Sequence, residues 1–120
     1  ECNLSGGIAN LRANIAIHSA DAEQALYWSE RAVAANRGEA QIEYANALRL
    51  LAQSKGLGKD PASAVPILEE SLAIDKRLGL PDKIDQDLLL LALAHQKLGN
   101  SEQANFYRER ATRINATLVK

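Results

Sequence analysis

The sequence predicts an all-α fold of six helices arranged as three antiparallel hairpins. The 120 residues are 47% hydrophobic and 24% charged, which provides enough apolar material for the core of one domain. Strong helix formers dominate, with 21 alanines and 18 leucines against 3 valines. Apolar residues recur at spacings of three and four along three long stretches, and a short break divides each stretch into two helices.

The first hairpin is predicted to follow a flexible segment at residues 1–7. Its first helix runs from Ile8 to Ser19, where apolar residues recur at helical spacing. Asp21 is placed to cap the second helix, with Gln24 three residues further on in the capping-box position. This helix closes at Asn36-Arg37-Gly38.

The second and third hairpins are delimited by glycine and proline. Two glycines predict a loop over residues 55–59, after which Asp60 or Ser63 caps a helix that ends at Gly79. The third hairpin begins near Pro81, breaks at residues 99–101 and continues to about Leu118. The predicted units are therefore residues 8–37, 38–79 and 82–118.

Small residues recur at fixed offsets in the three units. Aligning the second helices on Ala25, Ala64 and Ala104 gives periods of 39 and 40 residues. Seven residues later a second set of small residues coincides, and further alanines lie in the first helices. Because small side chains let neighbouring helices approach closely, these positions predict helix contacts. The remaining small residues are Ala32, Ser71 and Ala111 in the second set and, twelve residues before the first set, Ala13 and Ala92 in the first helices.

With these residues in place, the chain resembles a tetratricopeptide repeat (TPR) protein. The resemblance implies one domain over residues 8–118, an α-α superhelix (solenoid) of three hairpins. The repeat period of this chain exceeds the usual 34 or so residues. In this it is similar to the extended, kinesin-light-chain-like type of TPR, which is common in bacterial proteins. Segments 64–68, 71–74 and 78–82 carry that similarity, and the resemblance implies that Ala45 is the matching small residue in the first helix of the middle unit. The resemblance favours a helix start at Ser63, which would place Pro66 in the first turn.

The resemblance also implies a concave groove that binds a peptide or a helix. Amide, basic and apolar side chains on the first helices would line it, and could hold a peptide backbone, a carboxylate or an apolar anchor. The alternatives are that the polar residues are merely solvated and that the two leucines pack within the domain. The groove residues predicted in this way are Asn10, Asn14, His18, Asn46, Arg49, Leu89, Leu93, Gln96 and Lys97.

The carboxylate clamp by which some relatives hold chaperone tails is incomplete in this sequence. Asn14 matches one of its asparagines, but Asn10 stands where the lysine would be. Gln86 and Leu90 occupy the positions of its basic residues from the third repeat. We therefore do not expect a chaperone tail as the ligand.

No constellation of residues predicts catalysis, and we expect neither an enzyme nor a cofactor. The spacing of His18 and His95 fits no metal site, and His95 is interpreted as a packed side chain. The carboxylates at positions 69, 70, 85 and 87 are interpreted as surface groups with nothing to raise their pKa. The net charge of −1 predicts no nucleic-acid partner, and the basic face of the last helix (Arg108, Arg110, Arg113 and Lys120) is interpreted as solvated.

The predicted function is a protein–protein interaction adaptor or scaffold for a protein or peptide partner. The alternative is a sensory or regulatory arm from a larger bacterial regulator or enzyme, and a third hypothesis is a self-associating homo-oligomer. No apolar run approaches the 18 or so residues of a membrane span, and a cytoplasmic location is favoured. A periplasmic, lipid-anchored form through Cys2 is the alternative, provided that Glu1 is foreign to the natural chain.

Overall fold

The computed structural model describes residues 4–37 and 41–118, and confirms the all-α class. It contains six helices, and the described residues include no strand. The helices are α1 (Leu4–His18), α2 (Ala22–Asn36), α3 (Gln41–Leu57), α4 (Pro61–Leu78), α5 (Pro81–Lys97) and α6 (Ser101–Leu118).

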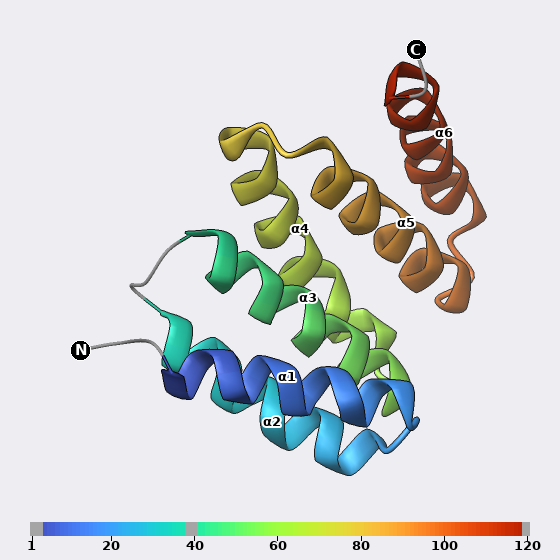
Figure 1. The fold of residues 1–120 in the computed structure, drawn as a ribbon. Coiled ribbons are helices and arrows are strands. Elements are labelled where there is room, and N and C mark those ends of the chain that lie inside the picture. Colours follow the sequence, from blue (N-terminus) through green and yellow to red (C-terminus); the bar gives the residue numbers. More distant parts are fainter. Residues whose placement is uncertain (1–3, 38–40, 119–120) are drawn as a thin grey trace.

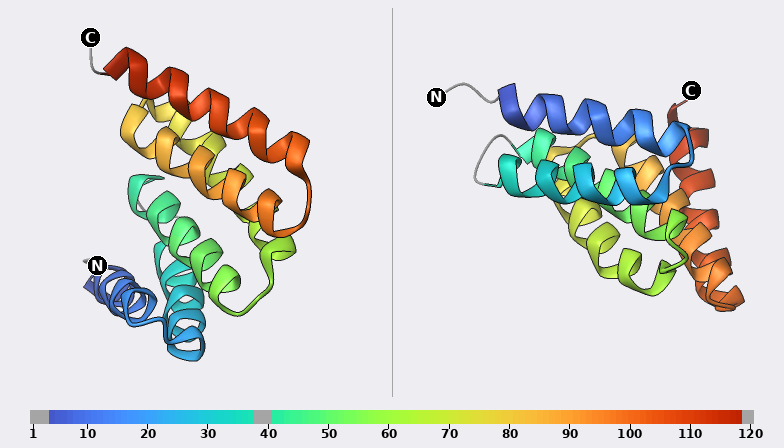
Figure 2. Two further views of the ribbon diagram at one scale, coloured as in Figure 1. Left: turned by 90° about the vertical axis from the view of Figure 1, so that its right-hand side faces the viewer. Right: turned by 90° about the horizontal axis from the view of Figure 1, so that it is seen from below.

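The helices pair as three antiparallel hairpins that stack on one another (Figures 1 and 2). Each helix packs against the next along the chain, and α1 also packs against α3. The hairpin of α1 and α2 and the hairpin of α5 and α6 therefore lie at opposite ends of the stack, with α3 and α4 between them (Figure 1). This arrangement is the α-α superhelix that the repeats predict.

The small residues that define the repeat are all buried between helices. None of the nine is more than 3% exposed, which confirms that they mark contact surfaces. They are Ala13, Ala25, Ala32, Ala45, Ala64, Ser71, Ala92, Ala104 and Ala111.

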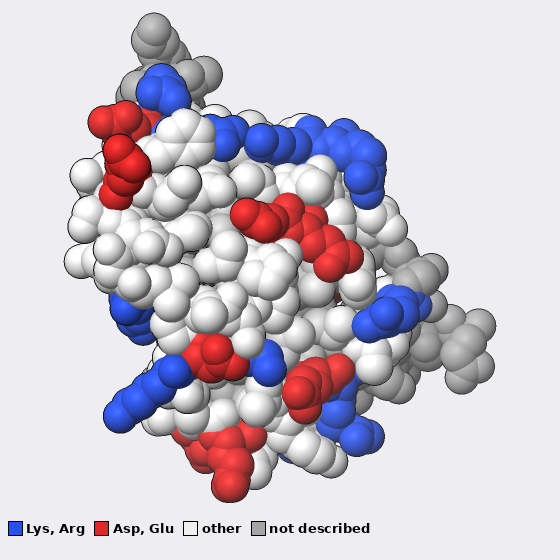
Figure 3. Space-filling view, turned by 180° about the vertical axis from the view of Figure 1, so that it is seen from behind, with Lys and Arg blue, Asp and Glu red and all other residues white. Residues whose placement is uncertain are grey.

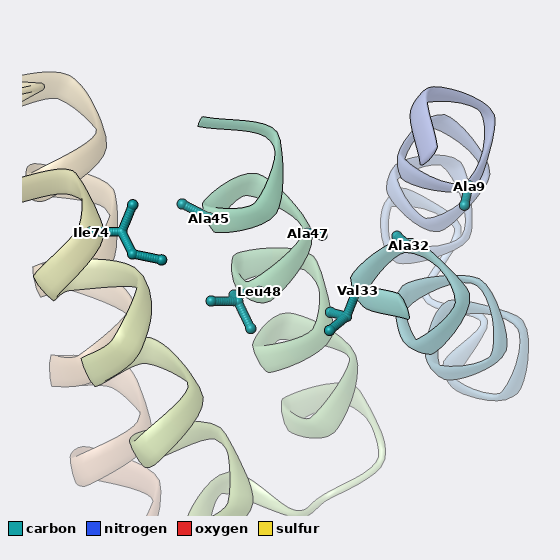
Figure 4. Close-up of a cluster of buried hydrophobic side chains, with 7 residues drawn as sticks. All are labelled: Ala9, Ala32, Val33, Ala45, Ala47, Leu48 and Ile74. Atoms are coloured by element: carbon teal, nitrogen blue, oxygen red, sulfur yellow. The ribbon is translucent and has the colours of Figure 1, made fainter. Parts of the chain in front are cut away.

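Two clusters of buried side chains form the core, and α3 and α4 contribute to both. In the first cluster, Leu48 of α3 lies between Val33 of α2 and Ile74 of α4 (Figure 4). The second joins Leu68 of α4 to Leu91 of α5 and to residues of α6. The core thus runs through the whole stack, and the middle hairpin is packed on both sides.

The turns inside the three hairpins share one backbone geometry. Ala20, Lys59 and Gly99 all have positive φ, at 57°, 65° and 81°. Each stands five residues before the first small residue of its second helix, at the break that the sequence alignment marks. A side chain in this conformation costs roughly 1 kcal/mol, so only Gly99 adopts it without strain. The repeat is therefore more regular in structure than in sequence.

Two predicted helix boundaries are wrong. Residues 4–7, predicted to be flexible, belong to α1, whereas residues 1–3 lie outside the described part of the chain. The loop predicted over residues 55–59 starts later, because α3 continues through Gly56 to Leu57. The amide of Gly58 still donates to the carbonyl oxygen of Ser54, 3.0 Å away, so a single glycine does not end this helix.

The predicted start of α4 at Ser63 is also wrong. Asp60 caps the helix: its Oδ1 accepts from the Ser63 amide at 3.3 Å and its Oδ2 accepts from the Ser63 hydroxyl at 2.7 Å. These hydrogen bonds lower the pKa of Asp60. Pro61 then occupies the first turn, where its missing N–H needs no partner. Pro66 consequently lies inside the helix on an exposed position, where it removes one backbone hydrogen bond.

Candidate functional site

The face formed by the first helix of each hairpin contains an open, mostly polar hollow of about 490 Å³. α1, α3 and α5 all contribute to it. We call it the polar hollow. Its lining residues are Asn10, Leu11, Asn14, Glu43, Asn46, Arg49, Leu50, Gln53, Lys83 and Gln86.

An apolar pocket of about 190 Å³ adjoins the polar hollow toward the C-terminal ends of α3 and α5. Gln53 lines both, so the two hollows are adjacent, and we call them together the groove. Ala64 and Leu68 of α4 contribute to the pocket although they are almost completely buried, so they form its floor. The other lining residues are Ile17, Ala52, Gly56, Leu57, Pro61, Leu90, Leu93, Ala94 and Lys97.

The structure brings six of the nine predicted groove residues to this groove. Asn10, Asn14, Asn46 and Arg49 line the polar hollow. Leu93 and Lys97 line the apolar pocket.

The other three predicted groove residues line neither part of the groove. His18 contacts the carbonyl oxygen of Asn14 through Nδ1 at 2.9 Å. Gln96 lies on the side of α6, where its Oε1 accepts from Nη2 of Arg108 at 2.9 Å. Leu89 is 45% exposed and borders neither hollow.

Sequence reasoning overlooked two charged residues of the groove, Glu43 and Lys83. Glu43 Oε1 accepts a hydrogen bond from Nδ2 of Asn10 at 3.3 Å, which links α3 to α1. A signal was present in the sequence, because both residues continue a stripe at spacings of three and four. The stripes are residues 43, 46, 50, 53 and 57 on α3 and residues 83, 86, 90, 93 and 97 on α5.

Arg49 lines the polar hollow but is only 4% exposed, because its guanidinium is held between α4 and α5. Nη1 donates to Asp75 Oδ2 at 2.5 Å, to Asp87 Oδ1 at 3.2 Å and to the Ser71 hydroxyl at 3.1 Å. Nη2 donates to Oδ1 of Asn46. The charge of Arg49 is therefore matched inside the fold, and this side chain does not offer it to a ligand.

Asp87 corrects the prediction that the carboxylates are surface groups with ordinary pKa values. It is fully buried, and burial together with a hydrogen bond to Asp75 raises the pKa of Asp87 to about 7, against the lowering effects of Ser71 and Arg49. Asp75 Oδ1 and Asp87 Oδ2 are buried, and within the described residues neither accepts a hydrogen bond from any donor other than a proton on one of these two carboxyls. When Asp87 holds a proton, its carboxyl can donate it to Asp75, and both oxygens then gain a partner.

The described residues contain no group of three His, Cys, Asp or Glu side chains that could hold a metal ion. His95 packs as predicted: its ring stacks on Tyr107 with centroids 5.6 Å apart. Trp28 is half-buried and packs against the first core cluster, with the guanidinium of Arg12 4.8 Å from the centre of its ring. None of the described helices has both the length and the apolar character needed to cross a membrane. Cys2 lies outside the described residues.

Charge on the opposite face is mixed. Figure 3 shows lysine and arginine side chains in a row along one edge, with acidic side chains directly below them. Lys76, Arg110 and Arg113 line one hollow together with residues of α5, and Arg110 also contacts the ring of Phe106. Neighbouring charges of opposite sign weaken the field of such a row.

Three stacked hairpins with a groove along their first helices define the fold as a TPR-type α-α superhelix. No family model matches the sequence, and no curated protein matches it either. Among solved structures, the chain is similar to the crystal structure of the TPR domain of Arabidopsis FLU, with a TM-score of 0.87. The two are 18% identical, and the match covers 94% of this chain and 96% of that one. The likeness confirms the predicted fold; the kinesin-light-chain-like type and a bacterial origin stay predictions.

Proposed function

We propose that this chain is a non-enzymatic protein–protein interaction module that binds a peptide or a helix in the groove. The observation that carries the proposal is the adjacency of the polar hollow and the apolar pocket across α1, α3 and α5. The TPR fold supports an interaction role.

The dimensions of the groove suit a short peptide. Lys83 and Lys97 stand fourteen residues apart on α5, which is about 21 Å at 1.5 Å per residue. An extended peptide of six or seven residues covers that distance. The amides of Asn14, Gln53 and Gln86 offer both donors and acceptors to its backbone along the way.

The position of the perturbed titratable groups supports a binding role over a catalytic one. Desolvation by burial raises the pKa of Tyr44, Tyr107 and Asp87. None of the three lines the groove, and Asp87 has no exposed surface. Enzymes place such groups where substrate can reach them, and this groove lacks them among its lining residues.

The experiment is a selection of random 12-residue displayed peptides on the immobilised chain, followed by titration of the winners. Gln86→Ala should weaken binding by about threefold to tenfold, the value of one hydrogen bond, and Asn14→Ala should do the same. The matched control is Gln96→Ala, which removes the same kind of side chain as Gln86→Ala, from the same helix α5 but outside the groove. Equal affinity for the wild-type chain and both groove variants would refute the proposal.

A further inference from the structure

We infer that the occupant of the groove is a peptide with one leucine-sized apolar side chain, flanked on both sides by carboxylates. This inference rests on the proposed function and specifies its partner. The apolar side chain enters the apolar pocket, and the carboxylates pair with Lys97 at the pocket and with Lys83 in the polar hollow.

The apolar pocket has room for a single side chain. Its 190 Å³ is slightly larger than a cavity of about 150 Å³ that holds benzene, and so accepts leucine, isoleucine, methionine or phenylalanine. The space exists because alanines stand where larger residues would fill it: Ala52, Ala64 and Ala94 are all at most 5% exposed. Leu93 remains 47% exposed at the rim, so an entering apolar group would cover it.

Lys97 lies across the pocket. Its Nζ is 3.9 Å from the position of a Cβ on Gly56, so the ammonium group of α5 reaches α3. Lys83 lines the polar hollow at the other end of the same α5 stripe. Neither lysine forms an ion pair with any residue that the structure describes.

The remaining charges in the groove do not cancel these two lysines. Glu43 is the one carboxylate among the lining residues of the two hollows, and it accepts from Asn10 at the α1 side. Arg49 is matched by Asp75 and Asp87. The groove therefore presents two lysines without an ion pair against one carboxylate, which leaves it positive beside an apolar pocket, and its electrostatic complement is an acidic peptide.

The helix geometry sets the spacing of the peptide. Lys97 is one turn beyond Leu93, about 6 Å along α5, which an extended chain spans in two residues. Lys83 is ten residues before Leu93, about 15 Å, which an extended chain spans in four or five residues. The expected motif has an acidic residue two positions from the apolar anchor on one side and another four or five positions away on the other.

The test uses the selected 12-residue peptides. They should be enriched in this motif, and replacing the anchor with alanine should lower affinity at least tenfold. Leu93→Ser should also weaken binding about tenfold. Leu89→Ser is the matched control, since it changes the same residue type with nearly equal exposure on the same helix but outside the pocket. Lys97→Gln should weaken binding severalfold and reduce its salt dependence, whereas Lys76→Gln on the opposite face should not.

The outcomes separate this inference from the proposed function. Peptides that respond to Gln86→Ala but bind Leu93→Ser and Lys97→Gln as tightly as the wild type would overturn the inference and leave groove binding intact. Selection of basic peptides, or of peptides without an apolar anchor, would also overturn it. If no selected peptide responds to any groove variant, both proposals fail.

Discussion

Replacing Asp87 with asparagine should remove a pH dependence from the stability of the fold. The carboxyl of Asp87 has a pKa of about 7 in the folded chain, because it is buried beside Asp75. In the unfolded chain its pKa returns to the ordinary aspartate value of 3.8. Between these values the native state holds a proton that the unfolded state has lost, so the free energy of unfolding falls as pH rises from about 4 to about 7. Above pH 7 this contribution stays constant.

The size of the effect follows from the same two values. Each pH unit in that window lowers the free energy of unfolding by up to about 1.4 kcal/mol. A change from pH 5 to pH 8 crosses about two such units, so the free energy of unfolding of the wild type should fall by about 3 kcal/mol. In Asp87→Asn, the amide can donate to Asp75 at every pH, while its oxygen still accepts from Arg49 and Ser71. This variant should therefore match the wild type at pH 5 and exceed it at pH 8.

Urea denaturation between pH 5 and pH 9 measures both chains. Asp82→Asn is the control, because it removes an exposed carboxyl from the first turn of the same helix. Its free energy of unfolding should fall with pH as that of the wild type does. If the free energy of unfolding of Asp87→Asn falls with pH as steeply as that of the wild type, the idea that Asp87 shares a proton with Asp75 is refuted. An Asp87→Asn variant that is less stable than the wild type by the same amount at both ends of the range would refute it too.

Three further predictions concern the stability of the stack, each measured by urea denaturation. Arg49→Met leaves Asp75 and Asp87 buried without their cation, and should lower the free energy of unfolding by about 3–5 kcal/mol at pH 8. The loss should be smaller at pH 5, where Asp87 is protonated, and an equal loss at both pH values would contradict this. Lys59→Gly relieves a positive φ of 65° and should stabilise by roughly 0.5–1 kcal/mol, so a loss would contradict the strain. Ala32→Leu overpacks a fully buried contact and should cost about 1–3 kcal/mol, whereas Ala34→Leu, two residues on and exposed, should be nearly neutral.

The fold was predictable because its signals are local and repeated. Alanines at a period of about forty residues mark helix contacts, and every one of the aligned small residues is buried. The boundaries were less predictable because competing local signals had similar strength. Asp60 and Ser63 can each cap α4, and the structure uses the Asp60 side chain with Ser63 as its donor. The resemblance to TPR proteins favoured a proline in the first turn, and so pointed to the wrong choice.

The groove was only partly predictable, because helix register shows which face a residue occupies but not what that residue meets there. Leu89 and Leu93 share one face of α5, yet only Leu93 reaches the apolar pocket. Arg49 falls on the groove stripe, but its partners Asp75 and Asp87 come from helices that periodicity alone does not bring together. The buried stripes of α4 and α5 do pass through these two acidic positions, so their burial was open to prediction even though their pairing was not.

Buried polar links join the middle hairpin to both of its neighbours, and they bear on the shape of the groove. The hydroxyls of Ser29 and Ser54 lie 2.7 Å apart between α2 and α3, and Arg49 joins α3 to α4 and α5. The small residues of a helix lie seven positions apart, so sliding one helix by about two turns would bring a small side chain against a small side chain again. Sliding would leave a buried hydroxyl or charge without its partner, which costs on the order of 1–3 kcal/mol or more. Our hypothesis is that these links fix how the helices are aligned along one another, and that this alignment gives the groove its shape. If so, Arg49→Met should bind peptide more weakly while circular dichroism still reports most of its helix.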